Sequence, residues 1–136
     1  MSERTTIDVI MVEPMKPPRM ITLNDNLESM QEAVGGWIEE YMPFPDEVAL
    51  ICNEEGKMNG MPLNRAIYGE DGQLLDIIAG PFFIAYAPIE SENFLSLPED
   101  LKRKYMQEFK HPQEFVMTPT GIKAIPMLPQ RDDFER

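Results

Sequence analysis

Apolar residues run together or alternate with polar ones in four short segments of the first half of the chain. Residues 5–13 are apolar on both alternating faces, which is typical of a strand buried on both sides. A proline-rich turn follows, and residues 19–23 resume as a strand, so the pair predicts a hairpin with a long loop. Residues 37–42 and 47–52 predict two further strands around a Pro-Phe-Pro-Asp turn.

Two segments have the spacing of amphipathic helices. Between Asn and Asp capping residues at 24–26 and a glycine pair at 35–36, apolar side chains recur every three or four positions. A second helix is predicted with Ser96 as its N-cap and acidic residues in its first turn. The residues expected on its buried face are Leu101, Tyr105, Met106 and Phe109.

The most apolar segment, residues 74–87, predicts a long strand bent at Gly80-Pro81. Strands therefore outnumber helices and do not alternate regularly with them. This pattern predicts an α+β fold, with an antiparallel or mixed sheet of about five strands and two packed helices. A chain of 136 residues suffices for one core. We expect a single domain at residues 1–115 and a proline-rich extended tail at 116–136.

The charge changes the picture of possible partners. The net charge is −12, and residues 21–100 hold 16 acidic but only 2 basic side chains. Such a balance argues against direct binding to nucleic acid or to an anionic membrane. The acidic residues keep the protein soluble, or they form a negative surface that binds a basic partner. No apolar run is long enough to span a bilayer and no signal-peptide pattern is present, so we expect a cytoplasmic protein.

The common catalytic patterns are missing from the sequence. His111 is the single histidine and Cys52 the single cysteine, so neither a zinc site nor a Cys–His nucleophile is expected. Neither a phosphate-binding P-loop pattern nor a G-x-S-x-G motif occurs. We therefore expect no enzymatic activity, no metal and no cofactor, with Cys52 a buried apolar residue.

Residues 51–69, ICNEEGKMNGMPLNRAIYG, combine turn residues with the only two bases between Met20 and Leu101. Glycines and asparagines allow tight turns that expose backbone N–H groups to an anion. Lys57 and Arg65 would add positive charge, while Asn53 and Asn64 would form hydrogen bonds with the polar edges of a base or a ribose. The alternative is a plain turn with Lys57 in solvent and Arg65 paired with a nearby carboxylate, namely Glu54, Glu55 or Asp76.

Four stretches together resemble a known family. They are VGGWIE, ICNEEGKMNGMPLNRAIY, DIIAGPFFIA and FLSLPEDLKRKY, and the likeness extends from about Asp8 to Phe115. The resemblance is to the domain-of-unknown-function family numbered three-eight-four-six, found in bacteriophages, plasmids and integrative elements. It implies a small accessory protein of a phage or mobile element, a class that includes many antagonists of host defence. It implies no catalytic residues.

Two functions of different classes follow. The first is a non-enzymatic counter-defence protein that sequesters a nucleotide-like anionic ligand, with a base stacked on Trp37, Phe82 or Tyr86. The second is an acidic DNA mimic that binds a basic host protein, such as a restriction enzyme or another DNA-binding enzyme. Its surface would include Glu28, Glu32, Glu39 and Asp46. A scaffold or homo-oligomeric regulator without a ligand is the third alternative.

Overall fold

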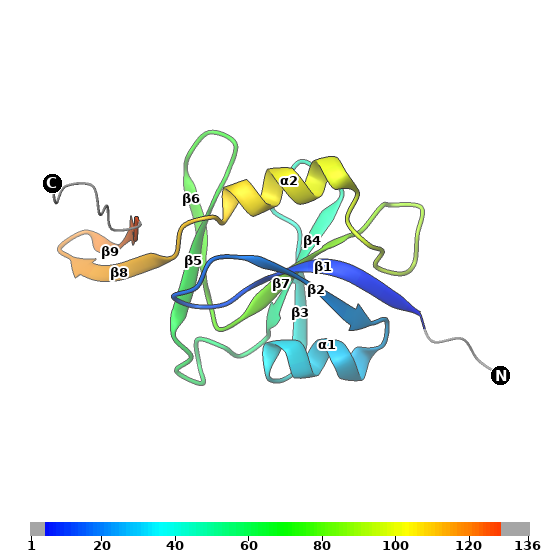
Figure 1. The fold of residues 1–136 in the computed structure, drawn as a ribbon. Helices are drawn as coiled ribbons and strands as arrows, with labels where there is room; N and C mark the ends of the chain where they lie inside the picture. Colours follow the sequence, from blue (N-terminus) through cyan, green and yellow to red (C-terminus); the bar gives the residue numbers. More distant parts are fainter. Residues whose placement is uncertain (1–4, 129–136) are drawn as a thin grey trace, which may run out of the picture.

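The centre of the fold is a five-stranded antiparallel sheet with strand order β2-β1-β7-β4-β3 (Figure 1). The structure is a computed structural model that describes residues 5–128. The five strands are β1 (Thr6–Val12), β2 (Arg19–Asn24), β3 (Ile38–Tyr41), β4 (Val48–Asn53) and β7 (Phe82–Tyr86). Together with two helices and two small hairpins they make an α+β fold in which strands dominate, as the sequence predicts.

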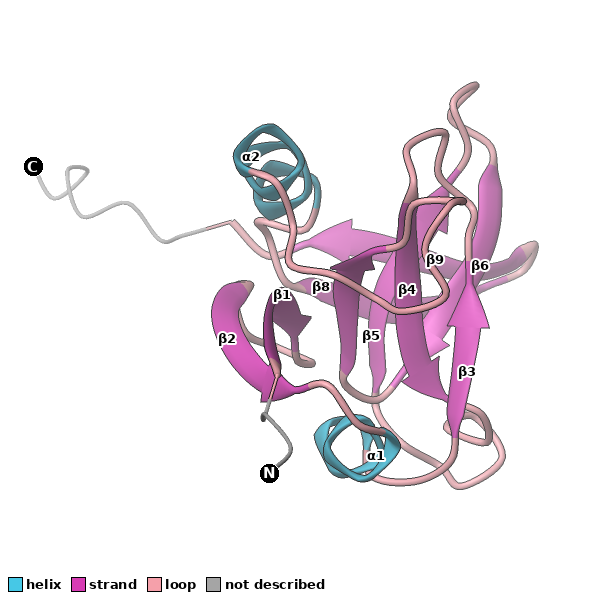
Figure 2. Cartoon of the chain, turned by 90° about the vertical axis from the view of Figure 1, so that its right-hand side faces the viewer, coloured by secondary structure: helices cyan, strands magenta, loops and turns pink. Residues whose placement is uncertain are grey.

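Each face of this sheet is covered. Helix α1 (Leu27–Val34) packs on one face, while α2 (Glu99–Glu108) and the hairpin of β5 (Leu63–Tyr68) and β6 (Leu74–Ala79) pack on the other. Figure 2 shows the two helices on opposite sides of the strands. Alternate residues of β4 enter the two cores, and every residue of this strand is buried. Burial on both faces explains why the central strands are apolar at consecutive positions.

The capping signals around α1 have the predicted effect. The Asn26 side-chain oxygen accepts a hydrogen bond from the Ser29 N–H at 2.7 Å, and Gly35 ends the helix with a φ of 80°. Glycine adopts this left-handed conformation without the steric cost that a Cβ would bring.

The second helix starts later than predicted. Its N-cap is Pro98, which has no side-chain hydrogen bond to the helix, and Ser96 instead accepts a hydrogen bond from the Asp8 N–H at 2.8 Å. The predicted buried face is confirmed, with Tyr105 and Phe109 in the core and two partly buried neighbours packed against it. Within residues 5–128, neither helix is long and apolar enough to cross a membrane.

The prediction of one bent strand over residues 74–87 is wrong. β6 pairs with β5, whereas β7 pairs with β1 and β4, so the segment contributes to two different sheets. The chain passes between them at Gly80, whose φ is 83°. A Cβ at this position would lie 2.5 Å from the sulfur of Met61, a flexible side chain that can move, so it is the conformation that favours glycine here.

The predicted extended tail differs from the structure where the structure describes it. β8 (Gln113–Thr118) and β9 (Gly121–Pro126) form a hairpin, and the expected boundary at residue 116 falls inside β8. The Gln113 side-chain oxygen accepts a hydrogen bond from the Ala66 N–H at 2.8 Å, which joins the hairpin to β5. Residues 129–136 of the predicted tail lie outside the described residues.

Asp46 joins the β3–β4 loop to α2. Its carboxylate accepts hydrogen bonds from Lys104 Nζ at 2.6 Å and from the Tyr105 hydroxyl at 2.7 Å. These two hydrogen bonds hold the pKa of Asp46 below its ordinary value of 3.8. Asp46 is thus a structural anchor, and its charge is already paired.

Replacement of Asp46 by asparagine is expected to lower the free energy of unfolding by about 1 kcal/mol near pH 6. Because the folded-state pKa of Asp46 is lowered, its stabilising effect is present above about pH 4 and is lost as pH falls through that pKa. Urea denaturation of both proteins at a series of pH values checks this. A difference that stays constant from pH 6 to pH 3 would contradict it.

Candidate functional site

Arg65 lies in β5 and is 1 % exposed. Its Nε and Nη2 donate to the Phe109 carbonyl at 3.3 and 3.0 Å, and Nη2 also donates to the Lys16 carbonyl at 2.7 Å. Nη1 donates to the Asn64 carbonyl at 3.3 Å and to the Asn64 side-chain oxygen at 2.9 Å. These five hydrogen bonds equal the number of N–H groups on a guanidinium. None of the acceptors is a carboxylate.

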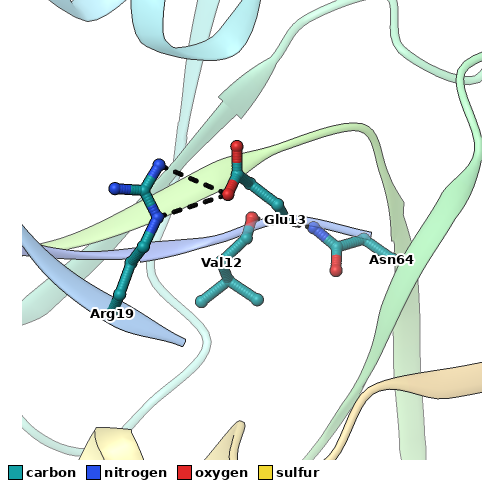
Figure 3. Close-up of polar contacts among 4 residues, drawn as sticks. All are labelled: Val12, Glu13, Arg19 and Asn64. Carbon is teal, nitrogen blue, oxygen red and sulfur yellow. Dashed lines mark hydrogen bonds and ion pairs between the residues drawn. The ribbon is translucent and has the colours of Figure 1, made fainter. Parts of the chain in front are cut away.

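Asn64 completes this buried polar cluster. Its side-chain nitrogen donates to the Val12 carbonyl at 2.9 Å and to the Gly80 carbonyl at 2.8 Å, and the residue has no exposed surface. Figure 3 shows Asn64 turned toward Val12 at the end of β1, beside the ion pair of Glu13 with Arg19. Asn64 and Arg65 together therefore bind backbone groups of β1, of the β1–β2 loop, of the C-terminal end of α2 and of the β6–β7 junction.

The position of Arg65 suits a structural cation. The Phe109 carbonyl belongs to the C-terminal end of α2, where the helix dipole is negative and a positive charge is favourable. Burial lowers the pKa of Arg65 to about 10, so the side chain is still charged at neutral pH. The sequence-based alternative, an ion pair of Arg65 with Glu54, Glu55 or Asp76, is wrong, because the guanidinium contacts only oxygens of Lys16, Asn64 and Phe109.

Asn53 and Lys57 lie in a different place, at the turn after β4. The Asn53 side chain accepts a hydrogen bond from the Glu55 N–H at 2.8 Å and donates to the Val34 carbonyl at 3.1 Å. Lys57 forms an ion pair with Asp76 of β6, with 2.8 Å between Nζ and Oδ1. The structure therefore separates the two predicted bases: Arg65 is in the interior and Lys57 is bound at the surface to a carboxylate.

The three aromatic residues predicted to stack on a base are also apart. Phe82 is fully buried and packs edge-on against Phe109 at a centroid distance of 5.3 Å. Tyr86 is partly buried against the same core. Trp37 precedes β3 and is 68 % exposed. The seven predicted ligand residues do not surround a common space.

A pocket of about 200 Å³ lies between β3, β4, β6 and the turn after β4. Among residues 5–128, four carboxylates line it, and the one basic side chain in the lining is Lys57, which is paired with Asp76. Its volume exceeds the roughly 30 Å³ that one water occupies in the liquid several-fold, so a side-chain head group fits. The acidic residues are Glu39, Glu54, Glu55 and Asp76.

Burial and the nearby carboxylates raise the pKa values of two groups in the pocket wall. The pKa of Cys52 is raised to about 11, first by burial and then by Glu39 and Asp76. The same causes raise the pKa of Tyr41. The contributions of Glu39 and Asp76 to both shifts agree with the excess of carboxylates in the lining, which favours a cationic ligand over an anionic one. Among residues 5–128, no group of three or more His, Cys, Asp or Glu is arranged to hold a metal ion.

The turn that closes the pocket depends on Gly56. A Cβ on this residue would lie 2.6 Å from the Ala79 carbonyl oxygen, so β6 and the turn approach each other more closely than alanine permits. Sequence reasoning missed this pocket because it joins β3 to β6, which lie more than thirty residues apart. The one available signal was Asp76, an isolated acid inside an otherwise apolar run.

Comparison with known proteins gives the family. The sequence profile described as "Domain of unknown function (DUF3846)" matches residues 7–110. The chain belongs to this family. The DUF3846 region includes the central sheet, both helices and the β5–β6 hairpin, and it ends before β8. Searches of curated proteins and of solved structures gave no significant match.

Proposed function

We propose that this protein is an acidic interaction protein that binds a basic partner, of the class of restriction enzymes and other enzymes that bind DNA. The observation that carries this proposal is the state of the acidic side chains in residues 21–100. Within residues 5–128, three of these 16 residues form ion pairs: Asp46, Asp76 and Glu99. All the others except the half-buried Asp25 are exposed.

Exposed carboxylates at this density create a negative potential over the surface, which accelerates association with a basic groove and disfavours binding to nucleic acid. Of the four acidic residues that the sequence suggested for this surface, Glu28, Glu32 and Glu39 are exposed. The carboxylate of Asp46 instead binds Lys104 and Tyr105 of α2. Glu39 also lines the acidic pocket beside β3. A phage or mobile-element origin and action in the host cytoplasm belong to this proposal through the family resemblance.

Sequestration of a nucleotide-like anion has weaker support. Arg65 has no N–H group left for a phosphate, and Lys57 is paired with Asp76 beside three further carboxylates. An anion in this pocket would meet net negative charge, which opposes its binding.

Inhibition of DNA cleavage tests the proposed function. Rising amounts of the protein are added to purified restriction endonucleases acting on a duplex substrate. We expect cleavage to slow with at least one of them, and the inhibition to weaken as the salt concentration rises, because ions screen exposed charges over about 10 Å at 0.1 M. Replacing Glu28, Glu32, Glu39 and Glu54 by lysine should abolish it.

The matched control replaces Glu108 and Glu114, two exposed acids outside the central region, by lysine and should leave inhibition in place. Melting temperatures with a panel of linear and cyclic nucleotides test the competing function. A ligand at one hundred times its dissociation constant would add about 2.7 kcal/mol of stability, and we expect no shift. A nucleotide-dependent shift that Lys57→Ala removes would overturn the proposal.

A further inference from the structure

Strand β3 has an open edge. It is the last strand of the central sheet, and its only strand partner among residues 5–128 is β4 (Figure 2). An open edge presents unpaired backbone N–H and C=O groups that can bind another extended chain. The opposite end of the sheet is formed by β2.

The hydrogen-bond pattern identifies which groups are free on this edge. The Glu54 N–H donates to the Trp37 carbonyl at 2.8 Å, so these two residues form a hydrogen-bonded pair of the β3–β4 ladder. In antiparallel pairs such positions alternate, so Glu39 and Tyr41 also direct their backbone groups toward β4. The N–H and C=O groups of Ile38 and Glu40 consequently point outward.

The side chains along the edge are acidic on both faces of the sheet. Glu39 is opposite Cys52 and lies on the face of the acidic pocket. Glu40 is opposite Ile51 and lies on the other face, where it lines a second hollow together with Glu92. Two successive residues of an added strand would therefore each meet a carboxylate, one on each face.

The acidic side chains on both faces of the β3 edge favour a basic partner strand over a second copy of β3. If β3 of a second copy paired antiparallel with β3, acidic residues would lie opposite acidic residues, which is destabilising. An extended segment with consecutive lysines or arginines meets complementary charge instead. The residue opposite Glu39 would occupy a non-hydrogen-bonded position, where the two side chains come closest, and would extend toward the pocket.

We infer that the β3 edge binds an extended, lysine- or arginine-rich segment of the partner by strand addition, with one basic side chain in the pocket beside Glu39. This deepens the proposed function and rests on it, because it names the part of the basic partner that is recognised. Backbone pairing gives affinity for an extended chain, and the carboxylates give selectivity for basic residues.

Two synthetic peptides test this inference. Both contain three consecutive lysines between valines, and the second is methylated on alternate backbone nitrogens, so it has the same charge but cannot pair as a strand. Trp37, the single tryptophan, is exposed next to β3 and reports binding by its fluorescence. We expect the unmethylated peptide to bind about tenfold more tightly, which corresponds to a loss of about 1.4 kcal/mol in the methylated one.

Two variants of Glu40 separate charge from backbone pairing. Glu40→Gln removes the charge and keeps the outward N–H, whereas Glu40→Pro removes both and leaves the bonds to β4 intact. We expect the proline variant to bind the peptide more weakly than the glutamine variant, with both melting near the unmodified protein. Equal affinity for both peptides, or no binding of either, would overturn strand addition.

These outcomes are distinct from failure of the proposed function. If the protein inhibits endonucleases but does not prefer the unmethylated peptide, the proposed function stands. The inference that the β3 edge binds the partner then fails. If the unmethylated peptide binds preferentially but no endonuclease is inhibited, DNA-binding enzymes are excluded as partners. Strand addition at the β3 edge would still be supported. Concentration-dependent self-association in place of peptide binding would assign the edge to a second copy and overturn the inference.

Discussion

Replacement of Arg65 by methionine is expected to lower the free energy of unfolding by about 4 kcal/mol. Methionine fills a similar space but leaves the buried Phe109 carbonyl and the partly buried Lys16 carbonyl without these donors, each at a cost of about 1–3 kcal/mol. The side-chain oxygen of Asn64 loses its donor as well. Because a domain is typically stable by only about 5–15 kcal/mol, this change removes a large share of the total.

Urea denaturation followed by circular dichroism measures the effect. Lys57→Met is the matched control: it removes the other base of the same segment, whose ion pair is exposed, and should cost about 0.5 kcal/mol. If the methionine variant does not fold, Arg65→Lys provides a milder test, because an ammonium offers at most three of the five hydrogen bonds. A loss below about 1 kcal/mol in both Arg65 variants would contradict the structural role.

Replacement of Phe82 by alanine is expected to cost about 3–5 kcal/mol. The ring is fully buried where β7 meets β1 and β4, and it packs against Phe109 of the opposing layer. Its removal leaves a cavity that the rigid central strand cannot close. The same denaturation measurement gives the magnitude.

Trp37→Ala is the control for this change, because Trp37 is another of the three aromatic residues predicted to stack on a ligand. It is mostly exposed, so its replacement should alter the free energy of unfolding by no more than about 0.5 kcal/mol. Equal costs for the two variants would show that burial does not distinguish their roles. Should Phe82→Ala fail to fold, Phe82→Leu keeps most of the volume and should cost less than about 1.5 kcal/mol.

The sequence predicted those parts of the fold that are determined by residues close together in the chain. The first helix follows from its apolar spacing and from the capping of Asn26 and Gly35, all within one short segment. The β1–β2 hairpin is confirmed for the same reason, since the two strands are neighbours in the chain. The break at Gly80 was misjudged because both halves of residues 74–87 have strand character, and only their partners reveal two sheets.

The candidate site was harder to predict because it depends on contacts between distant segments. The composition of residues 51–69 singled out Arg65 as a candidate ligand residue, but four of its five hydrogen bonds go to backbone carbonyls, which every residue possesses. Nothing in the residue types near Lys16 or Phe109 distinguishes these carbonyls from others. The pocket beside β3 likewise depends on the position of Asp76 relative to Glu39, which the order of elements does not fix.

The buried cluster around Arg65 also bears on how the chain reaches its native state. Its hydrogen bonds join residues separated by 44, 49 and 52 positions, so each closes a long loop. Contacts of such separation form late, because the entropy of loop closure must be overcome first. During synthesis, the bonds from Arg65 to the Phe109 carbonyl can form only after residue 109 has left the ribosome. We therefore expect the cluster to act chiefly on the rate of unfolding, which its hydrogen bonds would slow once α2 has docked.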